Sequence, residues 1–140
     1  MTTQAAIGYG VDVAIKWGSP EDWVSLGEIT NTVPPTTTRD AVDATHTGSQ
    51  DKYREFIPGL IDAGEATVDL NYVPGGATAV MLREAQEADD PVPVKISFPN
   101  GASVEFKAII TELSPEAPIE DKMTLSVTFK ITGKPVWTDV

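Results

Sequence analysis

His46 is the one histidine of this 140-residue chain, and a triad of the serine-hydrolase type would have to use it as general base. Asp43 or Asp51 could orient its imidazole ring, but no Gly-x-Ser-x-Gly turn presents a nucleophilic serine. A triad also requires three groups in one fixed geometry, whereas a histidine at a strand end commonly serves structure alone. We therefore assign no catalytic residue, and a hydrolase that depends on His46 is the third of three readings.

Metal and cofactor sites have equally little support. The chain has no cysteine, which excludes a thiol nucleophile, a disulfide scaffold and cysteine-ligated metals. The acidic pairs Asp89-Asp90 and Glu120-Asp121 match no calcium-loop pattern. Among 21 acidic residues chance pairs are expected, including pairs spaced for glycoside hydrolysis. The Gly-Tyr-Gly at 8–10 lacks the third glycine and following helix of a dinucleotide site, so we expect neither metal nor cofactor.

The chain is strongly acidic. Its 21 acidic and 10 basic side chains give a formal net charge of −11, and its arginines and lysines are scattered. Because phosphate binding relies on Lys and Arg, specific nucleic-acid binding is not expected. The N-terminal residues do not read as a signal peptide, and no apolar stretch is long enough to cross a membrane. We expect folding in the cytosol of the producing cell and no membrane partner.

The elements that must position these residues are mainly strands. Alternation of apolar and polar residues predicts about seven of them. They lie at 11–17, 23–29, 39–46, 65–72, 92–98, 104–113 and 123–132. An apolar stripe of Met81, Leu82, Ala85 and Ala88 predicts one helix at 77–89. The chain length suits a single domain, 1–140, mainly β: a β-sandwich or partly rolled barrel of about seven strands with one flanking α-helix.

Residues 47–64 are expected to form a long loop. The segment is interrupted at Pro58-Gly59 and again at Gly64, yet it is rich in aromatic and aliphatic residues. Loops of this length are uncommon in a compact domain and are usually functional. Contiguous exposed apolar surface marks a partner interface. We therefore favour contact with another subunit over a loop folded back on its own domain.

Two predicted strands, 65–72 and 123–132, have one apolar and one hydrophilic face. The hydrophilic side chains are Glu65, Thr67, Asp69 and Asn71 on the first strand, and Thr124, Ser126, Thr128, Lys130 and Thr132 on the second. Such faces suit contact with water, whether on the outside of a monomer or inside a wide tube.

Three longer segments carry a family resemblance. They are YREFIPGLIDAGE at 53–65, SFPNGASVEF at 97–106 and SPEAPIEDKMTLSVTFKITGKP at 114–135. In combination they resemble the major tail tube proteins of long-tailed, siphovirus-like bacteriophages, and the likeness extends over almost the whole chain.

That resemblance implies a structural protein. Tail tube subunits form hexameric rings that stack into a hollow tube, with sheets of neighbouring subunits joined edge to edge around the channel. The channel holds a tape-measure protein and later conducts genomic DNA without binding it specifically. The expected partners are therefore further copies of this chain, the tape-measure protein, and tail initiator and terminator proteins. The expected location is the virion tail, assembled in the bacterial host cytoplasm.

The resemblance also implies roles for particular residues. The intersubunit contacts would come from Tyr53, Arg54, Glu55, Phe56, Ile57, Leu60 and Trp137. The channel lining would be Asp43, Glu65, Thr67, Asp69 and Asn71. An N-terminal arm at 1–10 and a C-terminal arm at 134–140 would add contacts between rings.

A monomeric carbohydrate-binding β-sandwich module is the alternative reading. Such modules usually present a row of aromatic side chains on one face or loop. Trp17, Trp23 and Trp137 are dispersed along the chain, although Tyr53, Phe56 and Tyr72 could form a row.

Overall fold

The computed structural model describes residues 3, 5, 7–18 and 21–139, which contain nine β-strands, one α-helix and one short 3-10 helix. The strands are β1 (Asp12–Trp17), β2 (Asp22–Ser25), β3 (Ile29–Val33), β4 (Thr38–Asp43), β5 (Phe56–Asp62), β6 (Glu65–Asn71), β7 (Val92–Ser97), β8 (Ser103–Glu116) and β9 (Thr124–Thr138). The helix α1 is Ala77–Glu87, and the 3-10 helix η1 is Gln50–Lys52.

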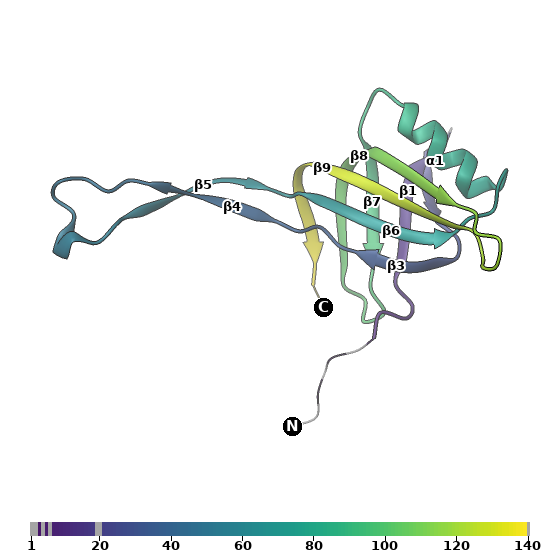
Figure 1. Ribbon diagram of the computed structural model, residues 1–140, viewed down its shortest axis with the longest axis horizontal. Coiled ribbons are helices and arrows are strands. Elements are labelled where there is room, and N and C mark those ends of the chain that lie inside the picture. The colour runs from purple at the N-terminus through teal and green to yellow at the C-terminus, as the bar shows by residue number, and fades with distance from the viewer. Residues whose placement is uncertain (1–2, 4, 6, 19–20, 140) are drawn as a thin grey trace.

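Seven strands form one antiparallel sheet in the order β2-β1-β7-β8-β9-β6-β3 (Figure 1). The long strands β8 and β9 are paired over almost their full length, with register shifts between Glu105 and Lys107 and between Ile110 and Glu112. Such irregularities bend a strand pair, and they divide the sheet into two halves. The first half of β8 pairs with β7, while the first half of β9 pairs with β6.

The core lies between these two halves of the curved sheet. Alternating residues of the central strands point inward, and the largest fully buried side chains include Phe129, Ile15, Ile96 and Val68. Met81, Leu82 and Ala85 of α1 belong to the same apolar cluster, and the helix lies beside β8 (Figure 1). A rolled sheet with one flanking helix is the predicted fold class, which the structure confirms.

β4 and β5 form a separate two-stranded sheet that projects far from the body (Figure 1). We call residues 38–62 the arm and residues 44–55 the arm tip. The arm prolongs the β3–β6 pair, because β3 leads into β4 and β5 leads into β6. Pro34 and Pro35 separate β3 from β4, and a proline cannot donate to a strand ladder.

The structure corrects several predicted boundaries. Residues 47–64 are not one long loop, because 56–62 form β5 with β4 as its partner. The strand predicted at 23–29 ends at Ser25, and the chain then turns through Glu28, which has a φ of 53°. The next strand, β3, covers residues 29–33, part of which was predicted to be a loop. The helix ends at Glu87.

Of the described residues of the two predicted terminal arms, only those of the C-terminal one are found in a strand. Residues 134–138 continue β9 instead of leaving the sheet. In the predicted N-terminal arm, residues 1–2, 4 and 6 lie outside the described part of the chain, while Ile7 and Tyr9 are exposed.

Candidate assembly surfaces

The arm exposes an unusual amount of apolar surface. Leu60 is 85% exposed and Tyr53 75%, and Phe56, Ile57 and Ile61 are each more than half exposed. A two-stranded ribbon has no second layer to cover either face, and alone it is marginally stable in water. Exposed apolar surface of this extent marks an interface. The residues of 53–60 that were predicted to contact another subunit thus lie on an accessible surface. Ile61, which was not among them, is exposed on the same arm.

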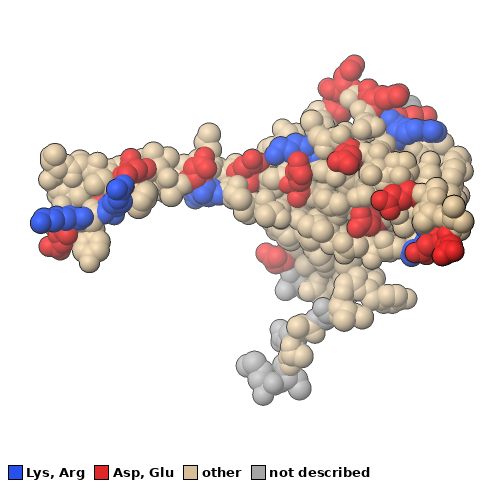
Figure 2. All heavy atoms as spheres, in the orientation of Figure 1, with Lys and Arg blue, Asp and Glu red and all other residues tan. Residues whose placement is uncertain are grey.

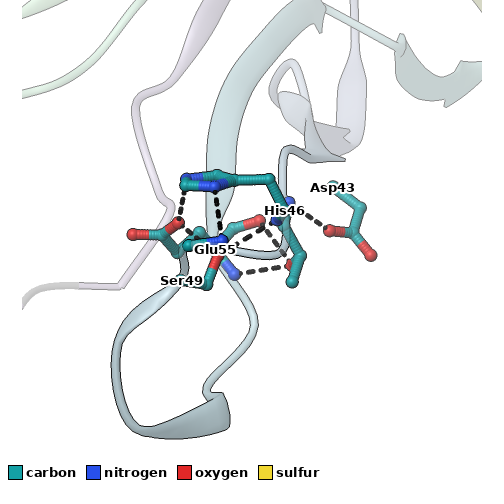
Figure 3. Close-up of polar contacts among 6 residues, drawn as sticks. Asp43, His46, Ser49 and Glu55 are labelled. Atoms are coloured by element: carbon teal, nitrogen blue, oxygen red, sulfur yellow. Dashed lines mark hydrogen bonds and ion pairs between the residues drawn. The ribbon is translucent and has the colours of Figure 1, made fainter.

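The arm tip is organised by a polar cluster (Figure 3). Nε2 of His46 lies 3.3 Å from Oε2 of Glu55, and Nδ1 of His46 accepts a 3.1 Å hydrogen bond from the N–H of Gly48. The Ser49 hydroxyl donates to Glu55 at 2.6 Å and accepts the His46 N–H at 3.1 Å. These contacts hold the imidazole ring between the Glu55 carboxylate and the backbone of the turn.

This cluster does not have the geometry of a catalytic triad. Ser49 bonds the Glu55 carboxylate instead of the imidazole, and both His46 nitrogens already have partners. His46 contacts Glu55 and Gly48, not the orienting groups Asp43 or Asp51 considered from the sequence. The arrangement closes a turn, which is the structural role expected of a strand-end histidine.

Asp43 and Arg54 form the second set of contacts at the tip. Nη1 of Arg54 lies 3.2 Å from Oδ2 of Asp43, and the N–H of Thr45 donates to Oδ1 of Asp43 at 2.9 Å. Hydrogen bonding from Thr45 is the main cause that lowers the pKa of Asp43, with Arg54 contributing less. Arg54 and Glu55 therefore already have polar partners inside the arm. The exposed apolar side chains are then the main part of the arm surface that is available to another subunit.

The second candidate surface is the hydrophilic face of β6 and β9. Its members are paired in register: Glu65 with Lys130, Thr67 with Thr128, Asp69 with Ser126 and Asn71 with Thr124. The intervening residues Ala66, Val68 and Leu70 are buried, so the predicted alternation is correct. We call these eight paired residues the hydrophilic face.

Asp43 does not belong to this face. It lies on β4 in the separate two-stranded sheet, opposite Phe56. The channel lining implied by the resemblance placed Asp43 beside Glu65, but β4 belongs to the arm. The arm residue that contacts this face is Asp62, whose Oδ1 lies 3.7 Å from Nζ of Lys130.

The four strands β3, β6, β9 and β8 form a half-sheet with two open edges. No described strand pairs with the outer side of β3. On the other side, β7 pairs with β8 through Ala108, so residues 109–116 have no further partner strand within the described chain. Open edges of this kind attract another strand unless they are covered.

Trp137 lies within β9 and is not on a loose tail. It is in register with Val104, and its ring stacks on Phe98 with centroids 6.5 Å apart and planes 6° from parallel. It remains 47% exposed, so part of the indole is still available to a neighbour.

Other kinds of site find little support. The described residues contain no cluster of three or more metal-ligating side chains. No helix in the described ranges is long and apolar enough to span a membrane. In Figure 2, acidic side chains are spread over the visible face of the body, and acidic and basic ones alternate along the arm.

Comparison with known proteins identifies the family. Residues 11–138 match the model of the lambda phage tail tube protein family. The chain therefore belongs to that family, as the resemblance predicted. Among curated proteins none matches the sequence significantly.

Solved structures share the fold at low identity. The chain is similar to a protein in the C6-symmetric tail of an empty gene transfer agent (GTA) particle, with a TM-score of 0.79, 15% identity and coverage of 96% of this chain and 100% of that one. It is similar to the SPP1 tail tube protein, with a TM-score of 0.70, 11% identity and coverage of 95% and 78%. It is also similar to a chain of the sheath/tube terminator of an extracellular contractile injection system, PVC, with a TM-score of 0.75, 10% identity and coverage of 99% and 100%.

The protein is a structural subunit of the tail tube of a phage or phage-like tail, and thus part of the tailed particle. The structural neighbours are tail tubes and tube-associated proteins instead of ligand-binding modules, so they lend no support to the carbohydrate-binding alternative.

Proposed function

We propose that this subunit forms hexameric rings, that the rings stack into a hollow tube, and that genomic DNA passes through the channel during ejection. The observation that carries the proposal is the four-stranded half-sheet, which combines a hydrophilic face with two open edges. Closure into a ring removes open edges, and a hydrophilic face suits a water-filled channel.

Ring closure would join the open edge of β3 in one copy to residues 109–116 of β8 in the next. Each contact is then heterologous, and six such contacts close a cyclic ring. The hydrophilic face of every copy would point to the same side of the joined sheet. We assign that side to the channel, with Glu65, Thr67, Asp69 and Asn71 in its wall.

Charge supports a channel for DNA. Six copies at −11 each would carry −66 together, and like charge repels phosphates. DNA could therefore move through such a tube with little tendency to bind. A tape-measure protein would occupy the same channel before DNA enters.

The arm would make the contact between subunits. Tyr53, Phe56, Ile57 and Leu60 would be buried against a neighbouring copy, and each large apolar side chain fully buried contributes roughly 1.5–3 kcal/mol. Trp137, whose indole is partly exposed, would add a contact at the end of β9.

We also assign a structural and not a catalytic role, since the His46 cluster closes a turn. Assembly would take place in the bacterial host cytoplasm, with tail initiator and terminator proteins at the two ends of the tube. Chains of similar fold occur in a baseplate and in a tube-terminating cap, which is consistent with such ends.

Negative-stain electron microscopy of the purified protein at rising concentration tests the proposal. Hollow tubes, with rings of six subunits in end views, are the expected result. Because tubes can require a nucleus, the same series is repeated with the tail initiator complex. Persistent monomers under both conditions, or rings of a different order, would overturn it.

A further inference from the structure

A slot runs along the free edge of β3. It has a volume of about 510 Å³ and is lined on one side by residues 29–32 of β3 and on the other by residues 8–11, which lead into β1. Successive residues of a strand point to opposite faces of the sheet, so a slot that touches four in a row follows the edge of the strand. Because that edge has no partner strand in the described chain, the slot fits an extended strand.

The wall formed by residues 8–11 is held in place by the body. Val11 at its end packs against the core cluster. Gly10 has a φ of +92°, and a Cβ atom there would lie 3.4 Å from the ring of Pro99 in the turn between β7 and β8. Tyr9 is 86% exposed. The slot therefore exists before a partner arrives, and the largest side chain of its wall is still open to solvent.

Thr32 is a second sign of a missing partner at this edge. Its two neighbours in β3 are in register with Asp69 and Thr67 of the hydrophilic face, so the Thr32 side chain points to the other side of the sheet. Its hydroxyl is buried and has no hydrogen-bond partner among the described residues. A buried polar group without a partner is unfavourable, and a strand in the slot would bring backbone N–H and C=O groups close to this hydroxyl.

The free part of β8, residues 109–116, meets the slot in the antiparallel sense. Three antiparallel pairings separate the two free edges: β3 with β6, β6 with β9 and β9 with β8. β3 and β8 therefore run in opposite directions, and rotation about a ring axis preserves this relation between neighbouring copies. In Figure 1, β3 is the lower border of the half-sheet and the second part of β8 is its upper border. One copy thus cannot fill its own slot.

The polar residues of this part of β8 continue the hydrophilic face. They are in register with members of that face on β9: Glu112 with Thr128, Ser114 with Ser126 and Glu116 with Thr124. Opposite Asn31 and Val33, which lie on the same side of β3, they would extend one polar surface from copy to copy. A shift of one residue would turn the two carboxylates toward the apolar core, so only registers two residues apart are allowed.

Other free strand edges fit the slot less well. β2 has only four residues and belongs to the other half of the sheet, so its addition would not continue the hydrophilic face. In the arm, the adjacent Phe56 and Ile57 are both exposed and would interrupt a polar surface. Two β3 edges could pair with each other, but that contact is isologous, closes at a dimer and leaves 109–116 without a partner.

We propose that β3 and residues 8–11 form a socket for residues 109–116 of the next copy in the same ring, with Tyr9 packed over the inserted strand. The proposal rests on the proposed ring and adds a second wall to its joint. Pairing with β3 supplies backbone hydrogen bonds, and the wall excludes water from them. The resemblance implied that residues 1–10 make contacts between rings, whereas residues 8–10 here act within a ring.

Engineered cysteines locate the joint, because the native chain has none. Asn31→Cys is combined in turn with Glu112→Cys, Ser114→Cys and Glu116→Cys, and assembled tubes are treated with a short thiol-specific cross-linker and analysed on a denaturing gel. At least one combination should give linked species up to the hexamer and none larger, since the link stays within a ring. The control Asn31→Cys/Glu105→Cys uses the part of β8 that pairs with β7 and should give no link.

Tyr9 tests the second wall separately. Tyr9→Ser should raise the concentration needed for tube formation by about tenfold, as expected for the loss of one buried aromatic contact. Tyr9→Phe should assemble nearly as the parent does, and Val24→Ser, at a partly exposed position of β2, should have no effect. Because Tyr9 is exposed in the monomer, the melting temperature of the monomer should not change.

The outcomes separate the socket from the proposed function. Cross-linked rings together with parent-like assembly of Tyr9→Ser would overturn the second wall alone. Intact tubes in which none of the three combinations is linked, or in which Asn31→Cys alone gives linked dimers, would overturn the insertion of β8 into the slot. A cysteine-free parent that forms no tubes, even with the initiator complex, would overturn the proposed function and the socket with it.

Discussion

Nζ of Lys130 on β9 lies 3.7 Å from Oδ1 of Asp62 at the root of the arm, and Lys130 is also the register partner of Glu65 on β6. The lysine of the hydrophilic face is therefore in contact with one carboxylate, that of Asp62, and has a second acidic residue, Glu65, as its cross-strand neighbour. Both members of the ion pair are well exposed, so the pair stabilises the fold by at most about 1 kcal/mol. Its main effect is electrostatic, because the ammonium group that could attract a DNA phosphate already faces negative charge.

Reversing the charge of the hydrophilic face should slow DNA delivery. In Glu65→Lys/Asp69→Lys, each subunit gains four units of positive charge on that face, and the proposed ring of six would gain many phosphate-binding groups. Tubes should form normally, since both side chains point away from the core. The measurement is the rate of DNA release from particles that carry the variant.

The neutral variant Glu65→Gln/Asp69→Asn is the control and should release DNA at nearly the parent rate. Parent-like delivery by the lysine variant in particles with intact tails would show that this face does not line the channel.

Polar substitution of the arm should prevent assembly without unfolding the subunit. Phe56→Ser/Ile57→Ser removes two apolar side chains that are more than half exposed in the monomer. Exposed substitutions usually change stability by less than about 0.5 kcal/mol, whereas loss of two buried contacts in the assembly should weaken it by roughly 3 kcal/mol or more. Sedimentation velocity should show monomers at concentrations where the parent forms tubes.

Val73→Ser, a comparably exposed residue of the body, is the matched control for this pair and should assemble. If the arm variant formed tubes as readily as Val73→Ser, the arm would not be the principal intersubunit contact.

The sequence predicted the strands of the body much better than the strands of the arm, because only the body strands have one buried and one solvated face. Residues 65–71 alternate cleanly because one side is buried and the other is solvated. In β5, Phe56 and Ile57 are adjacent and both exposed, so no alternation marks the strand. Pro58 and Gly59 then suggested a loop, yet Ala41 pairs opposite Pro58 in the arm. Because apolar residues are exposed on both faces of the arm, its sequence shows no alternation of apolar and polar residues.

Loss of the Thr45 hydroxyl should raise the pKa of Asp43. Hydrogen bonding from Thr45 is the main reason that this pKa lies below its ordinary value of 3.8. A carboxyl with a depressed folded-state pKa contributes stability above its unfolded value, and that contribution disappears as the pH falls through the folded-state pKa. The arm tip should therefore loosen in acid, and at a higher pH in Thr45→Ala.

A carbon-13 NMR titration of the Asp43 carboxyl measures this change. Thr45→Ser keeps the hydroxyl, so Asp43 should titrate as in the parent. Equal titration of Asp43 in the alanine and serine variants would show that the Thr45 hydroxyl does not lower the pKa of Asp43.

Gly64 should be the position where the junction between arm and body tolerates substitution least. Its φ of +71° costs a residue with a Cβ atom about 1–2 kcal/mol, and a Cβ there would overlap the carbonyl oxygen of Thr36 in the connection between β3 and β4. The Gly64 carbonyl also accepts the N–H of Ile131 at 3.1 Å, which ties the junction to β9. Relief of the overlap would therefore disturb the arm and the sheet together.

Gly75 separates the two causes, because it has a similar φ of +75° but open space around its Cβ position. Gly75→Ala should be destabilised only by the strained backbone conformation, by about 1–2 kcal/mol. Gly64→Ala should be destabilised by the same strain and also by the displacement of Thr36. In thermal unfolding followed by circular dichroism, Gly64→Ala should therefore melt several degrees below Gly75→Ala. Equal melting temperatures would mean that Thr36 moves freely and that the junction is not rigid, in which case the arm would change direction easily between ring copies.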